Sequence, residues 1–204
     1  MYTRDRTEEQ VLIMRAQRGE QDAFRALVER YQAQVYTLAR RMVSSPQDAE
    51  DVAQEAFLNA WRGLPRFRMD AKFSTWLYRL TVNAASDLLR RRQRTQETPL
   101  DDEDSALQLP DPAPGPEEQA QQRQRRAALQ QGINALSENH RKILLLRVVS
   151  DLDYAQIGEI LELSPGTVKS RLARARIELR KILRQQGNYF SDTSSNQEKG
   201  GGTP

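Results

Sequence analysis

The spacing of apolar residues is the feature that most limits how this chain can fold. Between positions 24 and 42 they recur at steps of three and four, which places them along one face of a helix. The residues of this stripe are Phe24, Leu27, Val28, Tyr31, Val35, Leu38 and Met42. Because no segment of useful length alternates apolar with polar residues in the manner of a strand, the sequence predicts an all-α fold.

The composition divides the 204 residues into two helical segments. Residues 8–94 and 119–185 each carry helical periodicity, and we expect two small domains. Residues 95–118 hold five prolines and eight Asp or Glu residues, without Arg or Lys. Such a segment buries too little apolar surface to offset the entropy of ordering, so it should be a flexible acidic linker. Residues 186–204 are expected to form a disordered tail.

In the first segment, cap signals mark where helices begin and end. Ser45 and Pro46 predict an N-cap and a first helical turn, and Gly63 predicts the end of that helix. The residues that this helix should bury are Val52, Ala56, Phe57, Ala60 and Trp61. A further helix is expected over residues 74–92. The residues of its expected inner face are Leu77, Leu80, Ala84 and Leu88.

The second segment should begin with a helix over about 119–135 and continue with a helix capped by Ser137. The residues of the capped helix that are available for burial are Ile143, Leu144, Leu146 and Val148. The single histidine of the chain, His140, lies in the polar run SENHRK. We expect it to be a solvated residue at the start of that helix.

The segment 154–184 has the spacing of a helix-turn-helix. A short amphipathic helix is predicted over 154–161, and a tight turn at Glu162 follows it. Ser164 and Pro165 then supply the cap and the first position of a second helix. The residues of its inner stripe are Val168, Leu172, Ala175, Leu179 and Ile182.

The outward face of this second helix is cationic. Residues 165–184 contain seven Arg or Lys against one Glu, although the net charge of the whole chain is only +3. A basic helix after a tight turn fits the major groove of duplex DNA, with its N-terminal half toward the base edges. The outward residues are Thr167, Lys169, Ser170, Arg171, Arg174 and Arg176. The alternative, a solvated helix in an ordinary bundle, is less favoured because the short helix, the turn and the Ser-Pro cap occur together.

A second basic window covers residues 66–94, with eight Arg or Lys against two Asp. Its aromatic residues Phe67, Phe73 and Trp76 alternate with cations. Aromatic rings can stack unpaired bases while cations hold the backbone, so the pattern suggests single-stranded or melted DNA. The alternative is that these rings belong to the hydrophobic core.

The helix expected over 46–61 is acidic and contains no Arg or Lys. Asp48, Asp51 and Glu55 fall on one face at steps of three and four. Acidic residues in the first turns of a helix also suit its dipole, which is the simpler explanation. A face that repels DNA on a DNA-binding protein could instead dock a protein partner.

Composition excludes several classes of site. The chain has no cysteine and one histidine, so disulfides, thiolate chemistry and histidine-rich metal sites are not expected. A magnesium-dependent nuclease would need clustered carboxylates with a basic surround, which the 46–61 helix lacks. No apolar run approaches the ~20 residues of a membrane span, and the N-terminus lacks the apolar stretch of a signal peptide. We therefore expect a cytoplasmic protein without cofactor, metal, catalytic activity or membrane insertion.

Four blocks in order resemble one family, the extracytoplasmic-function (ECF) sigma factors of bacterial RNA polymerase. GEQDAFRALVERYQAQVYTLARRM is similar to the opening helices of sigma region 2, and DAEDVAQEAFLNAW to its polymerase-binding helix. FRMDAKFSTWLYRLTVNAASDLLRR is similar to the promoter-melting segment, and LSENHRKILLLRVVSDLDYAQIGEILELSPGTVKSRLARAR to region 4. The resemblance covers about residues 8–185.

The resemblance implies a role for each block. The residues that would face the coiled coil of the polymerase β′ clamp are Asp48, Asp51, Gln54, Glu55 and Phe57. The residues that would capture the melted −10 element are Phe67, Arg68, Asp70, Lys72, Phe73, Trp76, Arg79, Asn83, Arg90 and Arg91. The residues that would bind the −35 duplex are Thr167, Lys169, Ser170, Arg171, Arg174 and Arg176.

The resemblance also implies partners. Core RNA polymerase would be bound through its β′ clamp and β flap, and an anti-sigma factor would cover these surfaces. The free protein would be a monomer, whereas a repressor that used the same helix-turn-helix would usually dimerise. The sequence departs from the family at Glu162, where glycine is common, at Gly158, where alanine is usual, and at the small Ala173. These departures leave the promoter preference open.

Overall fold

The computed structural model of the chain describes residues 2–43, 45–95 and 116–185. Within these residues the all-α prediction is confirmed, with eight α-helices, one short 3-10 helix (η1) and no strand. The elements are α1 (Tyr2–Gln17), α2 (Gln21–Met42), α3 (Pro46–Gly63), η1 (Leu64–Arg66), α4 (Phe73–Thr95), α5 (Pro116–Ala135), α6 (Glu138–Val148), α7 (Tyr154–Leu161) and α8 (Pro165–Gln185). Most of the predicted linker and the whole predicted tail lie outside the described residues.

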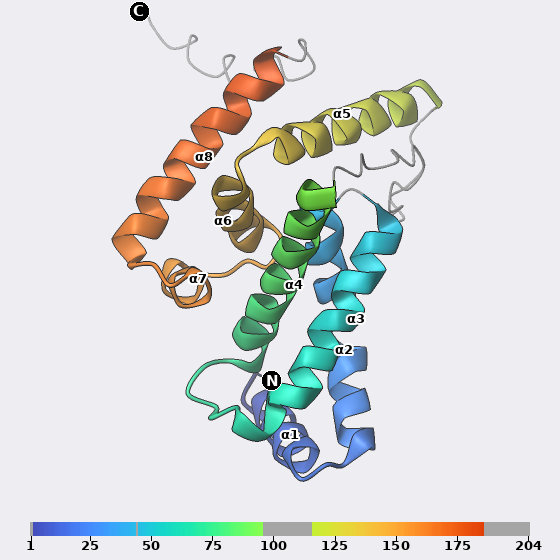
Figure 1. Cartoon of the computed structure of the whole chain (residues 1–204), viewed down its shortest axis with the longest axis vertical. Helices are drawn as coiled ribbons and strands as arrows, with labels where there is room; N and C mark the ends of the chain where they lie inside the picture. The colour runs from blue at the N-terminus through green and yellow to red at the C-terminus, as the bar shows by residue number, and fades with distance from the viewer. Residues whose placement is uncertain (1, 44, 96–115, 186–204) are drawn as a thin grey trace, which may run out of the picture.

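Helices α1 to α4 form the first half of the molecule, in which α2, α3 and α4 pack along one another (Figure 1). The cap at Ser45 is as predicted, since its hydroxyl accepts a hydrogen bond from the backbone N–H of Asp48 at 3.5 Å. Along α2 the predicted stripe is buried at Leu27, Tyr31, Val35, Leu38 and Met42. The residues that fill the largest fully buried positions of this half include Leu64, Phe73 and Leu77.

The buried face of α4 differs from the prediction. Leu77 is buried, but Leu80, Ala84 and Leu88 are only partly buried. The buried residues instead extend around the helix to Tyr78, Thr81, Val82, Ala85 and Ser86. The reason is that α4 contacts α2 and α3 on one side and α7 on another, so no single stripe describes its core face. Periodicity within one helix cannot show a contact made by a distant helix.

Helices α5 to α8 form the second half. The hydroxyl of Ser137 accepts from the backbone N–H of His140 at 3.4 Å, as the cap prediction requires. Two predictions about α6 were wrong. Val148, the last residue of the helix, is 66% exposed rather than buried, whereas the following Val149 packs against the core. His140 is not a freely solvated residue, because its Nδ1 atom is paired with the carboxylate of Glu178 on α8.

The two halves share a hydrophobic cluster, which the expectation of two separate domains did not include. Buried residues of α2 and α4, such as Met42 and Val82, belong to the same cluster as Ile143 and Ile157 of the second half. Helix α6 lies between α8 and the first half, and α7 lies against α4 (Figure 1). The chain between the halves, residues 96–115, lies outside the described residues.

Candidate nucleic-acid and protein interfaces

The acidic helix α3 presents part of the predicted surface to solvent. Asp51, Gln54 and Glu55 are exposed. Asp48 is not on this face, because its side chain is buried and lies 2.5 Å from the Arg92 guanidinium of α4. Burial raises the pKa of Asp48, and the charge of Arg92 opposes that rise. The assignment of Asp48 to a partner surface is therefore wrong. Asp48 instead forms an ion pair with Arg92 that joins α3 to α4.

An apolar groove runs beside the exposed acidic residues. Its volume is about 460 Å³, and its lining residues are Gln21, Phe24, Val28, Gln54, Phe57, Leu58 and Trp61. Phe57 and Trp61, which were expected in the core, are only partly buried because they form the wall of this groove. The rings of Phe24 and Trp61 lie 5.0 Å apart across α2 and α3. The groove is an apolar surface whose neighbouring residues on α3 are acidic.

The aromatic residues of the basic window pack on one another. Phe67 stacks on Trp76 with ring centroids 4.8 Å apart, and Phe73 packs against both rings. Phe67 and Phe73 are buried, while Trp76 is partly buried. The alternative that these rings belong to the core is therefore correct for Phe67 and Phe73, which are not available to stack a base in this structure.

The loop between η1 and α4, residues 67–72, carries the exposed polar residues of this window. Arg68, Asp70 and Lys72 are exposed. Met69 at the centre of the loop has a φ of 57°, a left-handed conformation that is uncommon outside glycine. The loop thus carries two exposed cations and one exposed carboxylate, and it lies next to a packed aromatic cluster.

Gln17, at the end of α1, was not singled out by the sequence. Its Nε2 atom donates hydrogen bonds to the carbonyl oxygens of Leu64 at 3.1 Å and Phe67 at 2.7 Å. A glutamine in a polar helix end gives no sequence signal for this contact, since its partners lie about fifty positions away.

The helix-turn-helix has the predicted local structure. Asp153 and Gln156 form a reciprocal capping box at the start of α7. Glu162 occupies the turn with φ 56° and ψ 46°, which is the left-handed conformation that favours glycine. The hydroxyl of Ser164 accepts from the backbone N–H of Thr167 at 3.3 Å and so caps α8.

Helix α8 buries Val168, Leu172 and Ala175 and leaves most of its cationic face in solvent. Four of the predicted DNA-contacting residues are exposed: Lys169, Ser170, Arg174 and Arg176. Thr167 is partly buried, and its hydroxyl lies 2.8 Å from that of Ser164. Arg171 is also partly buried, so these two residues are less available than the sequence suggested.

Comparison with known proteins now identifies the family. Residues 27–95 match the model of Sigma-70 region 2, and residues 126–179 match that of Sigma-70 region 4. The RNA polymerase sigma-H factor of Pseudomonas aeruginosa is 38% identical over 181 residues, which cover 86% of this chain and 94% of that protein. The ECF RNA polymerase sigma factor SigW of Bacillus subtilis is 35% identical over 185 residues, which cover 84% and 95%.

The chain belongs to the ECF sigma factors. It therefore directs promoter-specific transcription by RNA polymerase. Among solved structures, CnrH in complex with the cytosolic domain of CnrY has the same fold, with a TM-score of 0.67 and 24% identity over 88% of this chain and 99% of that one. Within the described residues, no helix is long and apolar enough to cross a membrane, and no group of acidic or histidine side chains could hold a metal ion.

In this sigma factor, residues from both halves line a common cavity. The cavity has a volume of about 290 Å³ and lies between α4, α6 and the turn that precedes α8. Arg79 and Asn83, predicted for the −10 element, line it together with Arg171, predicted for the −35 element. The other two predicted α4 residues, Arg90 and Arg91, are exposed, and Arg90 is paired with Asp87 at 2.6 Å.

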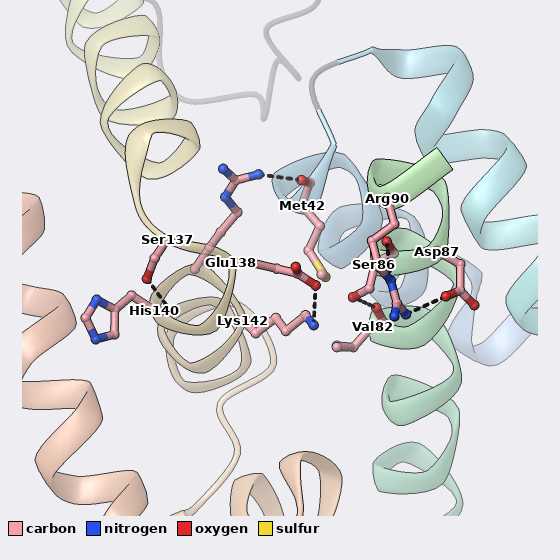
Figure 2. Close-up of polar contacts among 10 residues, drawn as sticks. Met42, Val82, Ser86, Asp87, Arg90, Ser137, Glu138, His140 and Lys142 are labelled. Atoms are coloured by element: carbon pink, nitrogen blue, oxygen red, sulfur yellow. Dashed lines mark hydrogen bonds and ion pairs between the residues drawn. The ribbon is translucent and has the colours of Figure 1, made fainter. Parts of the chain in front are cut away.

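Polar side chains of α6 extend toward α4 (Figure 2), and Lys142 among them lines this cavity. Lys142 lies 2.5 Å from Glu138, and its hydrogen bond holds the pKa of Glu138 below the usual range. Ser86 and Arg90 of α4 lower this pKa further. Residues of both halves therefore act on the ionisation of Glu138.

Arginine and glutamine side chains also connect the halves. Arg141 of α6 donates a hydrogen bond to the carbonyl oxygen of Met42 at the end of α2, at 3.3 Å. Arg41 and Gln130 exchange two hydrogen bonds, at 3.0 and 3.4 Å. Together with the shared hydrophobic cluster, these contacts keep the two halves of the sigma factor closed on each other.

Proposed function

We propose that this sigma factor binds core RNA polymerase through the acidic face and the apolar groove of its first half. The observation that carries the proposal is that exposed Asp51 and Glu55 lie beside a groove of about 460 Å³ walled by Phe57 and Trp61. An apolar groove with acidic neighbours suits a helical partner that combines apolar and cationic side chains. We assign this partner to the coiled coil of the β′ clamp.

The second part of the proposal concerns the −35 element. Lys169, Ser170 and Arg174 lie exposed in the N-terminal half of α8, which follows the capped turn of the helix-turn-helix. Side chains at this end of a recognition helix reach base edges in the major groove, and Arg176 would bind phosphate. The second half would also contact the β flap of the polymerase.

The third part concerns the melted −10 element. The loop 67–72 offers the exposed side chains Arg68, Asp70 and Lys72, and Trp76 is partly exposed at its base. A flipped base would enter beside Trp76, while Phe67 and Phe73 support the pocket from the core. Extruding a base costs a few kcal/mol, which stacking and backbone contacts can offset. No catalytic step is assigned to this chain.

Engagement of both promoter elements would require the halves to separate. The −10 and −35 elements are about two duplex turns apart, roughly 70 Å at 34 to 36 Å per turn. In the closed structure Arg79 and Arg171 line the same cavity of about 290 Å³. Binding to polymerase would therefore select a more open arrangement of the two halves.

An anti-sigma factor is the remaining proposed partner. The sigma factor RpoE that has a similar fold, with a TM-score of 0.61 and 23% identity, was solved in complex with the anti-sigma factor NepR from Bartonella quintana. In this chain the apolar groove and the exposed apolar residues Val148 and Ile177 are surfaces that such a protein could cover. In the absence of polymerase or anti-sigma factor, we expect a monomer.

The affinity for core RNA polymerase tests the proposal. Asp51→Arg should weaken binding about tenfold or more, because it places a cation where the partner's cations are expected. Glu29→Arg is the matched control, since Glu29 is an exposed acidic residue of α2 outside the groove. Equal affinities of the wild type and both variants would show that polymerase binds another surface.

A further inference from the structure

The loop that we assign to the −10 element begins at Phe67, whose ring and backbone carbonyl are both held by other residues. The ring of Phe67 is fixed by stacking on Trp76, with centroids 4.8 Å apart. Its carbonyl oxygen accepts a hydrogen bond from Nε2 of Gln17 at 2.7 Å. Phe67 is 8% exposed, so neither side of the residue is free to move without breaking a packed contact.

Gln17 fixes the turn that leads into the loop. The same Nε2 atom donates to the carbonyl oxygen of Leu64 at 3.1 Å, and the backbone N–H of Phe67 donates to that oxygen at 3.0 Å. The amide group of glutamine has two hydrogens, and both are used by carbonyls of this turn. Gln17 therefore closes η1 onto the end of α1.

Helix α1 is itself anchored, so it can act as a support. Ile13 and Ala16 are buried in the cluster that also contains Phe67 and Phe73. At the middle of α1, the hydroxyl of Tyr31 donates a hydrogen bond to the carboxylate of Glu9. A rigid helix that ends in Gln17 can thus hold the start of the loop in one place.

The far end of the loop is also fixed, since the backbone N–H of Trp76 donates to the carbonyl oxygen of Lys72 at 3.1 Å. Between the two fixed ends, Met69 takes a left-handed φ of 57°, and Arg68, Asp70 and Lys72 project into solvent. The orientation of these side chains depends on where the loop begins. Gln17 lies outside the matched region 2, which starts at residue 27.

We propose that Gln17 is a positioning residue for single-stranded promoter DNA, and that it acts by holding the loop 67–72 through the carbonyls of Leu64 and Phe67. It does not touch DNA. The inference rests on the proposed role of this loop, and it gives α1 a part in −10 recognition. The property that Gln17 controls is the preference for one base sequence over another, because a loose loop still attracts phosphates but does not hold a base in register.

The test uses the full chain and a randomised pool of single-stranded DNA, from which the wild type selects an oligonucleotide. The selected and a scrambled oligonucleotide are then compared by fluorescence anisotropy. Gln17→Leu should lower the ratio of the two affinities about tenfold, as expected for the loss of two hydrogen bonds that hold the loop. Gln17→Lys, which keeps a donor toward both carbonyls, should retain most of the preference.

A purely structural role would lower the melting temperature without changing this ratio. An unchanged ratio for Gln17→Leu would therefore overturn the proposal even if the variant were less stable. Duplex −35 binding by Gln17→Leu should equal that of the wild type, because α8 packs mainly on α5, α6 and α7, whereas α1 packs mainly on α2 and η1. A loss of both activities together would also overturn it, since it would indicate general unfolding.

If the wild type selects no sequence, the proposed role of the loop fails, and a second measurement still decides the role of Gln17. The chain has two tryptophans, so Trp61→Phe leaves Trp76 as a single fluorescent probe stacked on Phe67. In this background, Gln17→Leu should increase the quenching of Trp76 by acrylamide at least twofold. Unchanged quenching would show that Gln17 does not hold the loop.

Discussion

The carbonyl oxygen of Leu163 lies 2.5 Å from the point where a β-carbon on Gly158 would stand. The backbone of the turn approaches α7 this closely because the backbone N–H of Leu163 donates a hydrogen bond to the carbonyl oxygen of Gly158 at 2.8 Å. The departure of this sequence from the alanine that is usual at position 158 therefore has a steric explanation. Glu162 and Gly158 belong to one turn geometry.

Gly158→Ala should destabilise the fold by about 1–3 kcal/mol, the usual cost of forcing an extra carbon into a packed site. The contact is with backbone, which cannot rotate away as a side chain could. Urea denaturation followed by circular dichroism would measure the change. Gly166→Ala is the control, because a β-carbon there meets nothing within 4 Å. Equal stability of the two variants would contradict the account of the turn.

Glu162→Gly should have the opposite effect. Glu162 has a φ of 56°, and glycine adopts this conformation without the penalty of about 1 kcal/mol that a side chain incurs. The variant should therefore melt at a higher temperature than the wild type. A lower melting temperature would mean that the carboxylate makes a contact worth more than the strain.

Arg92→Ala should cost about 2 kcal/mol, because it leaves the carboxylate of Asp48 buried without its cation. Burial already raises the pKa of Asp48, and loss of Arg92 should raise it further. A raised pKa means that the folded state favours the protonated carboxyl of Asp48. The loss of folding stability is therefore present at pH values above the pKa of the folded state, and it disappears as the pH falls through that pKa. Unfolding at pH 7 and at about pH 4 would measure this. Arg94→Ala, at an exposed site in the same turn, should show no such dependence.

How much of this molecule could be predicted from sequence depends on the distance over which each contact acts. The caps at Ser45, Ser137 and Ser164 were predicted because a cap bonds a residue three positions away. The exposed face of α8 followed from helical periodicity for the same reason. These are interactions of one helix with itself.

The errors arose where a distant segment decides the environment. Asp48 shares a helical face with Asp51 in projection, but Arg92, forty-four positions later, holds it in the interior. In the sequence, Phe67 and Phe73 stand among cations as exposed rings would. In the structure Phe67 packs on Trp76, and Phe73 packs on Tyr31. Gln17 and the contact between the two halves gave no local signal at all.

Crosslinking the two halves in their closed arrangement should prevent initiation. Because the chain has no cysteine, two introduced cysteines would be the only sites of the crosslink. Arg41→Cys with Gln130→Cys places two thiols where the native side chains are 3.0 Å apart. Joining them with a short cleavable bismaleimide should abolish promoter-specific initiation with core polymerase, and cleavage of the linker should restore it. The reason is that Arg79 and Arg171 then stay in one cavity and cannot reach two separate promoter elements.

The control for this crosslink is Arg15→Cys with Glu20→Cys, whose native side chains are 2.8 Å apart within the first half. This crosslink should leave initiation unchanged. Initiation at the wild-type level by the protein crosslinked between residues 41 and 130 would show that the halves need not separate.

The most direct test of the central claim is promoter-specific initiation by core polymerase loaded with this sigma factor, measured on a pool of bacterial promoter fragments. Arg174→Ala, on the exposed face of α8, should bind polymerase like the wild type but lose initiation from −35-dependent promoters. Arg180→Ala, nearer the C-terminal end of the same helix, should retain it. If Arg174→Ala initiates from the same promoters with the same efficiency as the wild type, α8 does not read the −35 element, and the account of this sigma factor is contradicted.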